Sequence, residues 1–138
     1  MRSLPILVLP LLLGACVHAG PPVDPPREIA RSVVLTTAVA VKVADEACAV
    51  VVRERQDEAL GRSCEEAYRV ARSSLLAAGE SVDAWGDGQR QGVACGVAKA
   101  ARALARVGEL LRERGVDLPP VAVDALKLAP AVVGGCHG

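Results

Sequence analysis

Aromatic and histidine side chains are scarce in this 138-residue chain, which limits the chemistry it can perform. It contains no Phe, one Trp and one Tyr, and its two histidines, His18 and His137, stand close to the two ends. So few rings leave little to stack on nucleobases or to build an aromatic ligand pocket. No convincing Ser-His-Asp set for acyl transfer can be assembled either.

A net charge of one sign is also missing. Sixteen basic and sixteen acidic residues balance to a formal net charge of +0. A basic surface that would attract nucleic acid is therefore not expected, and we predict no nucleic-acid partner. The length suits one domain with a modest core.

Closely spaced cysteine pairs are lacking as well. The five cysteines form neither the Cys-x-x-Cys of a redox enzyme nor the Cys-x-x-Cys-His of a c-type haem site. Structural zinc sites usually contain a close cysteine pair, and only the adjacent Cys136 and His137 come near that pattern. We expect no metal, no cofactor and no thiol chemistry.

The run from Asp83 to Gly88 is similar to the start of a calcium-binding loop, but the similarity ends at the ligands. The third loop position is Trp85, and the twelfth, where a bidentate glutamate is needed, is Ala94. We interpret the run as a helix end with acidic turn residues and a half-buried tryptophan.

A pair of carboxylates for glycan cleavage is the remaining catalytic possibility. The acids Asp45, Glu46, Glu65 and Glu66 are better explained as solvated or capping residues. We therefore predict no catalytic residues and no enzyme activity, with a periplasmic hydrolase as the lesser alternative.

The amino-terminal residues have three features that fit together. Arg2 supplies a positive charge, residues 4–13 form an apolar run, and Gly14 and Ala15 are small residues before Cys16. Ten apolar residues in a helix span only about 15 Å, roughly half a bilayer core, so a transmembrane anchor is disfavoured. An ordinary secretory peptide cut near Ala15 or Ala19 is a weaker alternative.

Leu13-Gly14-Ala15-Cys16 resembles the lipobox of bacterial lipoprotein signal peptides. The resemblance implies that residues 1–15 are removed and that Cys16 carries covalent lipid, diacylglycerol on its sulfur and often an acyl chain (palmitate-type) on its amino group. It implies a membrane partner through that lipid. In enteric lipoproteins an Asp after the cysteine retains the protein in the inner membrane, so Val17 favours the outer membrane, facing the periplasm or displayed outside.

Residues 16–27 are predicted to be a lipid anchor and tether. The stretch from Val17 to Arg27 holds four prolines and a glycine, which favour an extended chain over a helix. Its eleven residues would reach roughly 34 Å at about 3.1 Å per residue.

Residues 28–138 are predicted to form a helical domain, because apolar residues recur at helical spacing between Gly and Pro breaks. The first helix is expected over 28–60, ending before Gly61, and the second from a capping box at Ser63 and Glu66 to Trp85. The third is expected over 89–114 with Gly115 as its cap, and the fourth from Pro119-Pro120 to about residue 129, with Pro130 stopping or kinking it. The buried stripes are expected at Val33, Thr37, Ala40, Ala44, Ala47 and Val51; at Cys64, Tyr68, Ala71, Leu75, Ala78, Val82 and Trp85; and at Val93, Val97, Ala100, Leu104, Val107 and Leu111.

The predicted fold is therefore all-α, a small up-and-down bundle of three long helices plus one short C-terminal helix.

Residues 33–52 are apolar enough to suggest a membrane span. However, Lys42, Asp45 and Glu46 stand in the middle of the run, where each would cost about 2.5 to 3.5 kcal/mol at a bilayer centre. Small Ala and Val residues on the stripes imply closely spaced helices without a large internal cavity.

Four cysteines remain once Cys16 is assigned to lipid, and an even number in an exported chain suggests two disulfides. Cys95 lies opposite the apolar stripe of its helix, among Lys99, Arg102 and Arg106, so it is expected to meet the carboxyl tail with Cys136. We favour the pairs Cys48–Cys64 and Cys95–Cys136. A turn near Gly61 would place Cys48 far from Cys64, which keeps open the rival pairs Cys48–Cys95 and Cys64–Cys136.

Two classes of function fit these observations. The first is a noncatalytic envelope lipoprotein, a helical binding or structural module that contacts another envelope protein. The second is a phage-type lysis or accessory lipoprotein, or a small inhibitor. Neighbouring genes of a lysis cassette would favour the second, and an envelope operon would favour the first.

Overall fold

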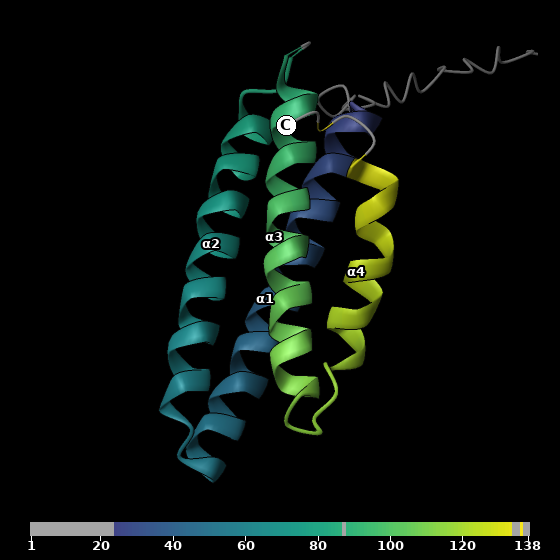
Figure 1. Ribbon diagram of the computed structural model, residues 1–138. Coiled ribbons are helices and arrows are strands. Elements are labelled where there is room, and N and C mark those ends of the chain that lie inside the picture. The colour runs from purple at the N-terminus through teal and green to yellow at the C-terminus, as the bar shows by residue number, and fades with distance from the viewer. Residues whose placement is uncertain (1–23, 87, 134–135, 137–138) are drawn as a thin grey trace, which may run out of the picture.

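The computed structural model describes residues 24–86, 88–133 and 136. These residues form four helices and no strand: α1 (Pro25–Arg55), α2 (Glu58–Asp83), α3 (Gln89–Arg112) and α4 (Pro120–Val133). Consecutive helices run antiparallel, so the chain passes up and down along one elongated bundle (Figure 1). The predicted all-α bundle of three long helices and a shorter fourth, joined by two disulfides, is confirmed.

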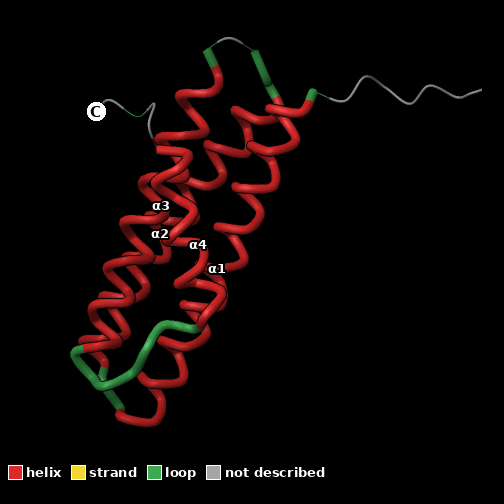
Figure 2. The backbone as a smooth tube through the Cα atoms, turned by 90° about the vertical axis from the view of Figure 1, so that its right-hand side faces the viewer, coloured by secondary structure: helices red, strands yellow, loops and turns green. Residues whose placement is uncertain are grey.

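Helices α1 and α3 form the centre of the bundle. Each of them contacts the three other helices, whereas α2 and α4 do not contact one another. In Figure 1 α2 and α4 accordingly lie on opposite sides of α3, with α1 behind. The α1–α2 turn and the α3–α4 loop meet at one end of the bundle, as Figure 2 shows, and the α2–α3 connection lies at the other.

Helix α1 begins before the predicted boundary. Asp24 is its N-cap, and the Asp24 side chain accepts a hydrogen bond from the Arg27 backbone N–H at 3.4 Å. Pro25 and Pro26 occupy the first turn, where the missing N–H groups would have no helical partner and the fixed φ already suits a helix. Residues 25–27, which were predicted to be extended, are therefore helical. Residues 16–23 lie outside the described residues.

The α1–α2 turn differs most from the sequence prediction. Gln56 adopts a left-handed conformation with φ 53°, and the Asp57 carboxylate accepts from the Leu60 N–H at 2.9 Å as the N-cap of α2. The capping box at Ser63 and Glu66 was wrong, because Asp57 caps as well as a serine does and starts the helix earlier. The chain then passes through Gly61 in helical conformation.

The ends of α3 and α4 show one confirmed prediction and one error. Gly115, with φ +71°, donates to Arg112, and the Val116 N–H donates to Leu111, which is a Schellman ending of α3. Helix α4 does not stop at Pro130 but continues to Val133. A proline can keep helical φ at the cost of one backbone hydrogen bond, and here only one further turn of helix follows.

The core is built from small side chains, and the predicted stripes face it. The stripe residues are buried, except that Val33, Ala47, Tyr68 and Trp85 are half-buried. Helices α2 and α3 approach so closely at Gly96 that an added Cβ would lie 2.6 Å from the Ser74 carbonyl oxygen and 2.7 Å from the Ala78 Cβ. None of the described helices combines the length and the apolar character needed to cross a membrane.

Candidate functional site

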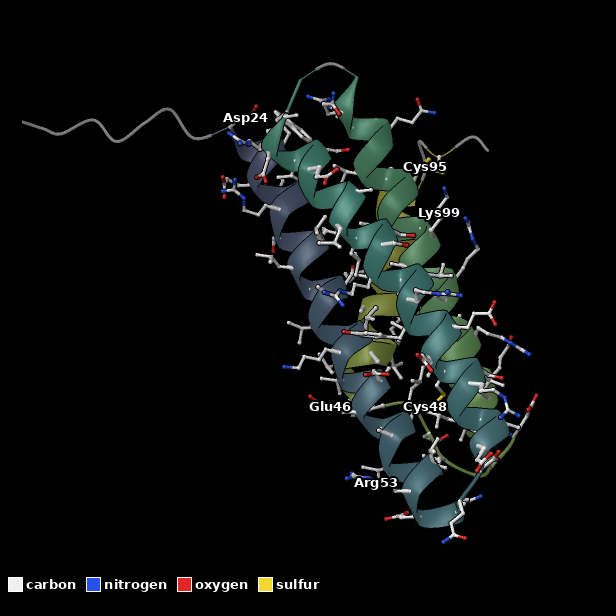
Figure 3. All side chains as sticks on the ribbon, turned by 90° about the vertical axis from the view of Figure 1, so that its left-hand side faces the viewer. Asp24, Glu46, Cys48, Arg53, Cys95 and Lys99 are labelled. Atoms are coloured by element: carbon white, nitrogen blue, oxygen red, sulfur yellow. A yellow bond between two sulfur atoms is a disulfide. The ribbon has the colours of Figure 1, made fainter. Side chains whose placement is uncertain are left out.

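An open groove runs between α1 and α2. Its wide end, about 750 Å³ in volume, lies beside the Cys48–Cys64 disulfide and is bounded by Tyr68. Figure 3 shows Glu46, Cys48 and Arg53 at this end of α1. The two cysteines come together because α1 ends at Arg55, so that the turn lies midway between them.

The groove continues toward the other end of the bundle as a narrower section of about 280 Å³. Tyr68 lines both sections, so the wide and narrow ends form one surface along the same helix pair. The narrow floor is apolar, and Leu76 at its rim is 61% exposed. The floor residues are Val34, Ala38, Val41 and Leu75. A smaller space of about 10 Å³ where α1, α2 and α3 meet, lined by Tyr68 and Leu104, is no larger than a water site.

The two sections of the groove carry opposite charges. Three carboxylates and one cation line the wide end, from Asp45, Glu46, Glu65 and Arg53. Lys42 and Arg72 line the narrow end and no carboxylate does. The groove is therefore acidic near the disulfide, carries two cations next to this acidic section, and is apolar beyond them toward Val34.

Asp45 is the one groove acid that departs from the sequence interpretation. Glu46, Glu65 and Glu66 are exposed, as predicted, but Asp45 is half-buried. Burial raises the pKa of the Asp45 carboxyl above its ordinary value of 3.8, and the neighbouring Glu46 charge raises this pKa further. The sequence pattern missed Asp45 because it lies on the border between the buried and exposed faces of α1.

The cysteines follow the favoured pairing. Cys48 and Cys64 have Cα atoms 6.5 Å apart, and Cys95 and Cys136 have Cα atoms 4.9 Å apart. Cys48 and Cys64 are buried in the core, whereas Cys95 and Cys136 are half-buried on the outer side of α3. The predicted lipid site Cys16 lies outside the described residues.

The described part of the chain bears on the predictions made for a metal site and for the turn at Trp85. Within residues 24–86, 88–133 and 136, no group of three or more His, Cys, Asp or Glu side chains could hold a metal ion. His18 and His137 are outside that part.

Trp85 is half-buried against the core, as predicted, and the Arg90 guanidinium lies 5.8 Å from the centre of the Trp85 ring.

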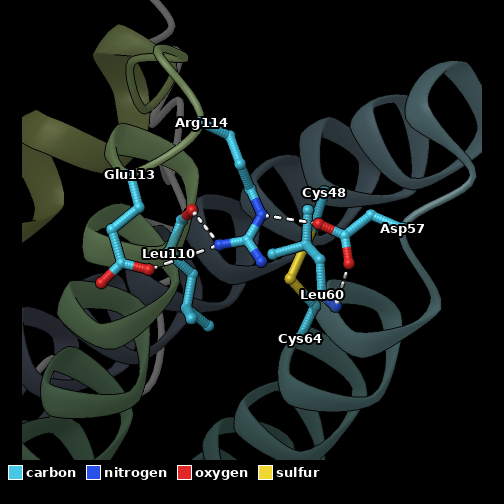
Figure 4. Close-up of a disulfide and its surroundings, with 7 residues drawn as sticks. All are labelled: Cys48, Asp57, Leu60, Cys64, Leu110, Glu113 and Arg114. Carbon is cyan, nitrogen blue, oxygen red and sulfur yellow. Dashed lines mark hydrogen bonds and ion pairs between the residues drawn. A yellow bond between two sulfur atoms is a disulfide. The ribbon is translucent and has the colours of Figure 1, made fainter.

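The sequence reasoning missed an ion pair that joins the two loops at one end of the bundle. Arg114 Nε lies 2.9 Å from the Asp57 Oδ2 atom (Figure 4). Asp57 lies inside the first helix predicted over 28–60, so no capping role was expected for it. A sequence signal for the Asp57 cap was present, because an aspartate directly before a glutamate and a helical apolar pattern is typical of a helix start.

Fold and groove together define a small disulfide-stapled helical bundle with an open interhelical groove. Comparison of the chain with protein-family models, with curated proteins and with solved structures finds no match.

Proposed function

We propose that the chain is a noncatalytic lipoprotein of the cell envelope, outer membrane rather than inner, whose helical domain binds an amphipathic helix of another envelope protein. The anchor rests on the sequence from Leu13 to Cys16 and on Val17. Helix α1 begins shortly afterwards, since the eight residues from Val17 to Asp24 would reach about 25 Å at about 3.1 Å per residue. The domain would thus be held close to the membrane surface.

The observation that carries the binding role is the groove between α1 and α2. From Val34 to Val52 it runs roughly 27 Å along α1, the length of about five helical turns. A helix with an apolar stripe fits such a groove by the helix-in-groove mode of recognition. Its complementary partner carries a basic residue opposite Asp45 and an acidic residue about one helical turn away, opposite Lys42.

Site-specific photo-crosslinking in cells tests the binding role. A crosslinking residue at Leu76, on the groove rim, is compared with one at Leu128, which is 55% exposed on α4 and outside the groove. We expect a specific adduct from position 76 only. The crosslinked partner segment, made as a peptide, should then bind the wild-type chain and the Leu128→Glu variant, and should lose affinity for Leu76→Glu. Adducts at both positions, or equal peptide affinity for both variants, would refute the groove role.

Metabolic labelling tests the anchor separately. Cells expressing the full chain are given radiolabelled palmitate, and the protein is partitioned between detergent and aqueous phases. The Cys16→Ala variant should lose the label and correct processing, and any of it that has lost residues 1–15 should leave the detergent phase. Cys136→Ser should keep the label and the detergent-phase fraction. A labelled Cys16→Ala protein would overturn the lipoprotein proposal while leaving the groove experiment intact.

A further inference from the structure

Positive charge is concentrated on α3. The whole chain has equal numbers of basic and acidic residues, yet α3 carries five cationic side chains and one carboxylate, Glu109. The cations are Arg90, Lys99, Arg102, Arg106 and Arg112. The positive charge of the chain is therefore gathered on α3 and is not spread evenly over the four helices.

Three of these cations line a second groove, between α2 and α3. Lys99, Arg102 and Arg106 are spaced three and four residues apart, so they lie on one face of α3 and span about 10 Å. The groove is about 470 Å³ in volume, and all three cations are exposed. Figure 3 shows Lys99 on the outer side of α3, below Cys95.

The three charges are poorly neutralised by the protein itself. Lys99 and Arg102 have no ion pair with any described residue, and Arg106 has one exposed pair, with Glu109 at 3.1 Å. Glu66 is the one carboxylate that lines the groove, and it forms no ion pair with the three cations. Like charges at this spacing on a helix repel one another. Their arrangement therefore favours the binding of an anion.

We infer that the α2–α3 groove binds phosphate groups, supplied by anionic lipid headgroups or by a soluble phosphate ester. Two guanidinium forks suit bidentate contact with phosphate oxygens, and the Lys99 ammonium adds a point charge. Ser63 places a hydroxyl donor on the opposite wall. The exposed Val70 and the buried Leu110 also line the groove and can contact an alkyl portion of the ligand. This site differs from the α1–α2 groove and does not depend on lipid at Cys16.

Calorimetric titration of the purified full chain in a nonionic detergent tests the inference. The titrants are inorganic tripolyphosphate, phosphatidylglycerol in the same detergent, and zwitterionic phosphatidylcholine as the headgroup control. The double variant K99Q/R102Q should bind at least about tenfold more weakly than wild type, because two charge-assisted contacts are lost. The matched control is R55Q/K127Q, which removes the same charge from exposed positions on α1 and α4, outside both grooves, and should bind as wild type does.

The outcomes separate the two sources of phosphate. Tripolyphosphate binding that K99Q/R102Q weakens supports a soluble ester, and phosphatidylglycerol binding alone, with the same dependence, supports a lipid headgroup. Equal weakening in R55Q/K127Q would show that the loss of affinity follows from net charge alone, and would overturn the inference. Absence of binding to both anions, or equal binding of phosphatidylcholine, would overturn it too. Unfolding midpoints of both variants, expected to match wild type because all four positions are exposed, control for folding.

Discussion

Arg114 donates a hydrogen bond from Nε to the Asp57 Oδ2 atom at 2.9 Å and thereby joins the end of α3 to the α1–α2 turn. The same guanidinium donates to the Leu110 carbonyl oxygen at 3.0 Å, and Asp57 accepts from the Leu60 N–H (Figure 4). One carboxylate therefore caps α2 and holds the neighbouring loop. Both side chains are partly shielded, with 22% and 27% exposure, so the pair is less screened than the surface pairs elsewhere on the bundle.

Replacement of Arg114 by Gln should lower the midpoint of thermal unfolding, because Asp57 then loses its cationic partner and the Leu110 carbonyl loses a donor. Arg112→Gln is the matched control, since Arg112 is exposed at the end of the same helix. Circular dichroism melts of both variants give the comparison. Equal midpoints for the two variants would show that the pair contributes nothing to stability.

Stability should fall in acid through Asp57. The hydrogen bond from the Leu60 N–H holds the pKa of the Asp57 carboxyl below its ordinary value of 3.8, and the hydrogen bond from Arg114 lowers this pKa further. Because the folded pKa is depressed, this stabilisation is present above pH 3.8 and is lost as the pH falls through the lower folded value. Urea unfolding between pH 7 and pH 2 (roughly the range over which such carboxyls titrate) should show a smaller acid loss for Asp57→Asn than for wild type. An unchanged acid slope would contradict the prediction.

Asp45 should behave in the opposite way. Its raised pKa means that the charged carboxylate is disfavoured in the folded protein, a penalty that disappears below pH 3.8, where the folded and unfolded forms are both protonated. Asp45→Asn should therefore stabilise the protein at neutral pH, with a gain that shrinks as the pH falls. Glu54→Gln, at an exposed position on the same helix, is the control and should show no such gain.

Two helical glycines should respond to alanine with opposite signs. At Gly96 a new methyl group would meet the Ser74 carbonyl oxygen at 2.6 Å, so Gly96→Ala should destabilise the bundle by about 1 to 3 kcal/mol through overpacking. At Gly79 the added Cβ meets nothing within 4 Å, and Gly79→Ala should stabilise by roughly 0.5 to 1 kcal/mol through helix propensity. Denaturant unfolding measures both, and a stabilising Gly96→Ala would show that α2 and α3 are farther apart than described.

The two disulfides should differ in their rate of reduction. Cys48 and Cys64 are 1% and 4% exposed, whereas Cys95 and Cys136 are half-buried, and thiolate attack requires access to sulfur. Brief treatment of the native protein with a reductant, followed by alkylation and peptide mass analysis, should label Cys95 and Cys136 first. Earlier labelling of Cys48 and Cys64 would contradict the burial order. Full reduction should destabilise the fold, because bridges with separations of 16 and 41 residues each contribute on the order of 2 to 4 kcal/mol.

Most of the fold could be predicted from the sequence because apolar periodicity acts locally. The spacing of residues such as Val93, Val97 and Leu104 identified the face of α3 that the structure buries. Gly115 was identified as a helix end because few other residues adopt positive φ without strain. The favoured cysteine pairs were also confirmed, although the predicted turn near Gly61 argued against one of them.

The turn itself was decided by tertiary contacts. Asp57 and Ser63 are both acceptable N-cap residues, and local propensity does not choose between them. Asp57 gains a second partner, Arg114, which lies 57 residues away in the sequence. With the turn at Asp57, Cys48 reaches Cys64, so one long-range arrangement satisfies the cap, the ion pair and the disulfide together.

The sequence by itself determined the helices, their buried faces and the amino-terminal pattern from which the lipid anchor is proposed, because these depend on residues close together in the chain. Only the tertiary structure decided where α1 ends, how α2 lies against α1, and which polar residues line the grooves. A groove is formed by two helices whose crossing depends on the packing of distant side chains. Tyr68 shows the difference, since its spacing assigned it to a core stripe, and the packing of α1 against α2 left it half-buried in the groove wall.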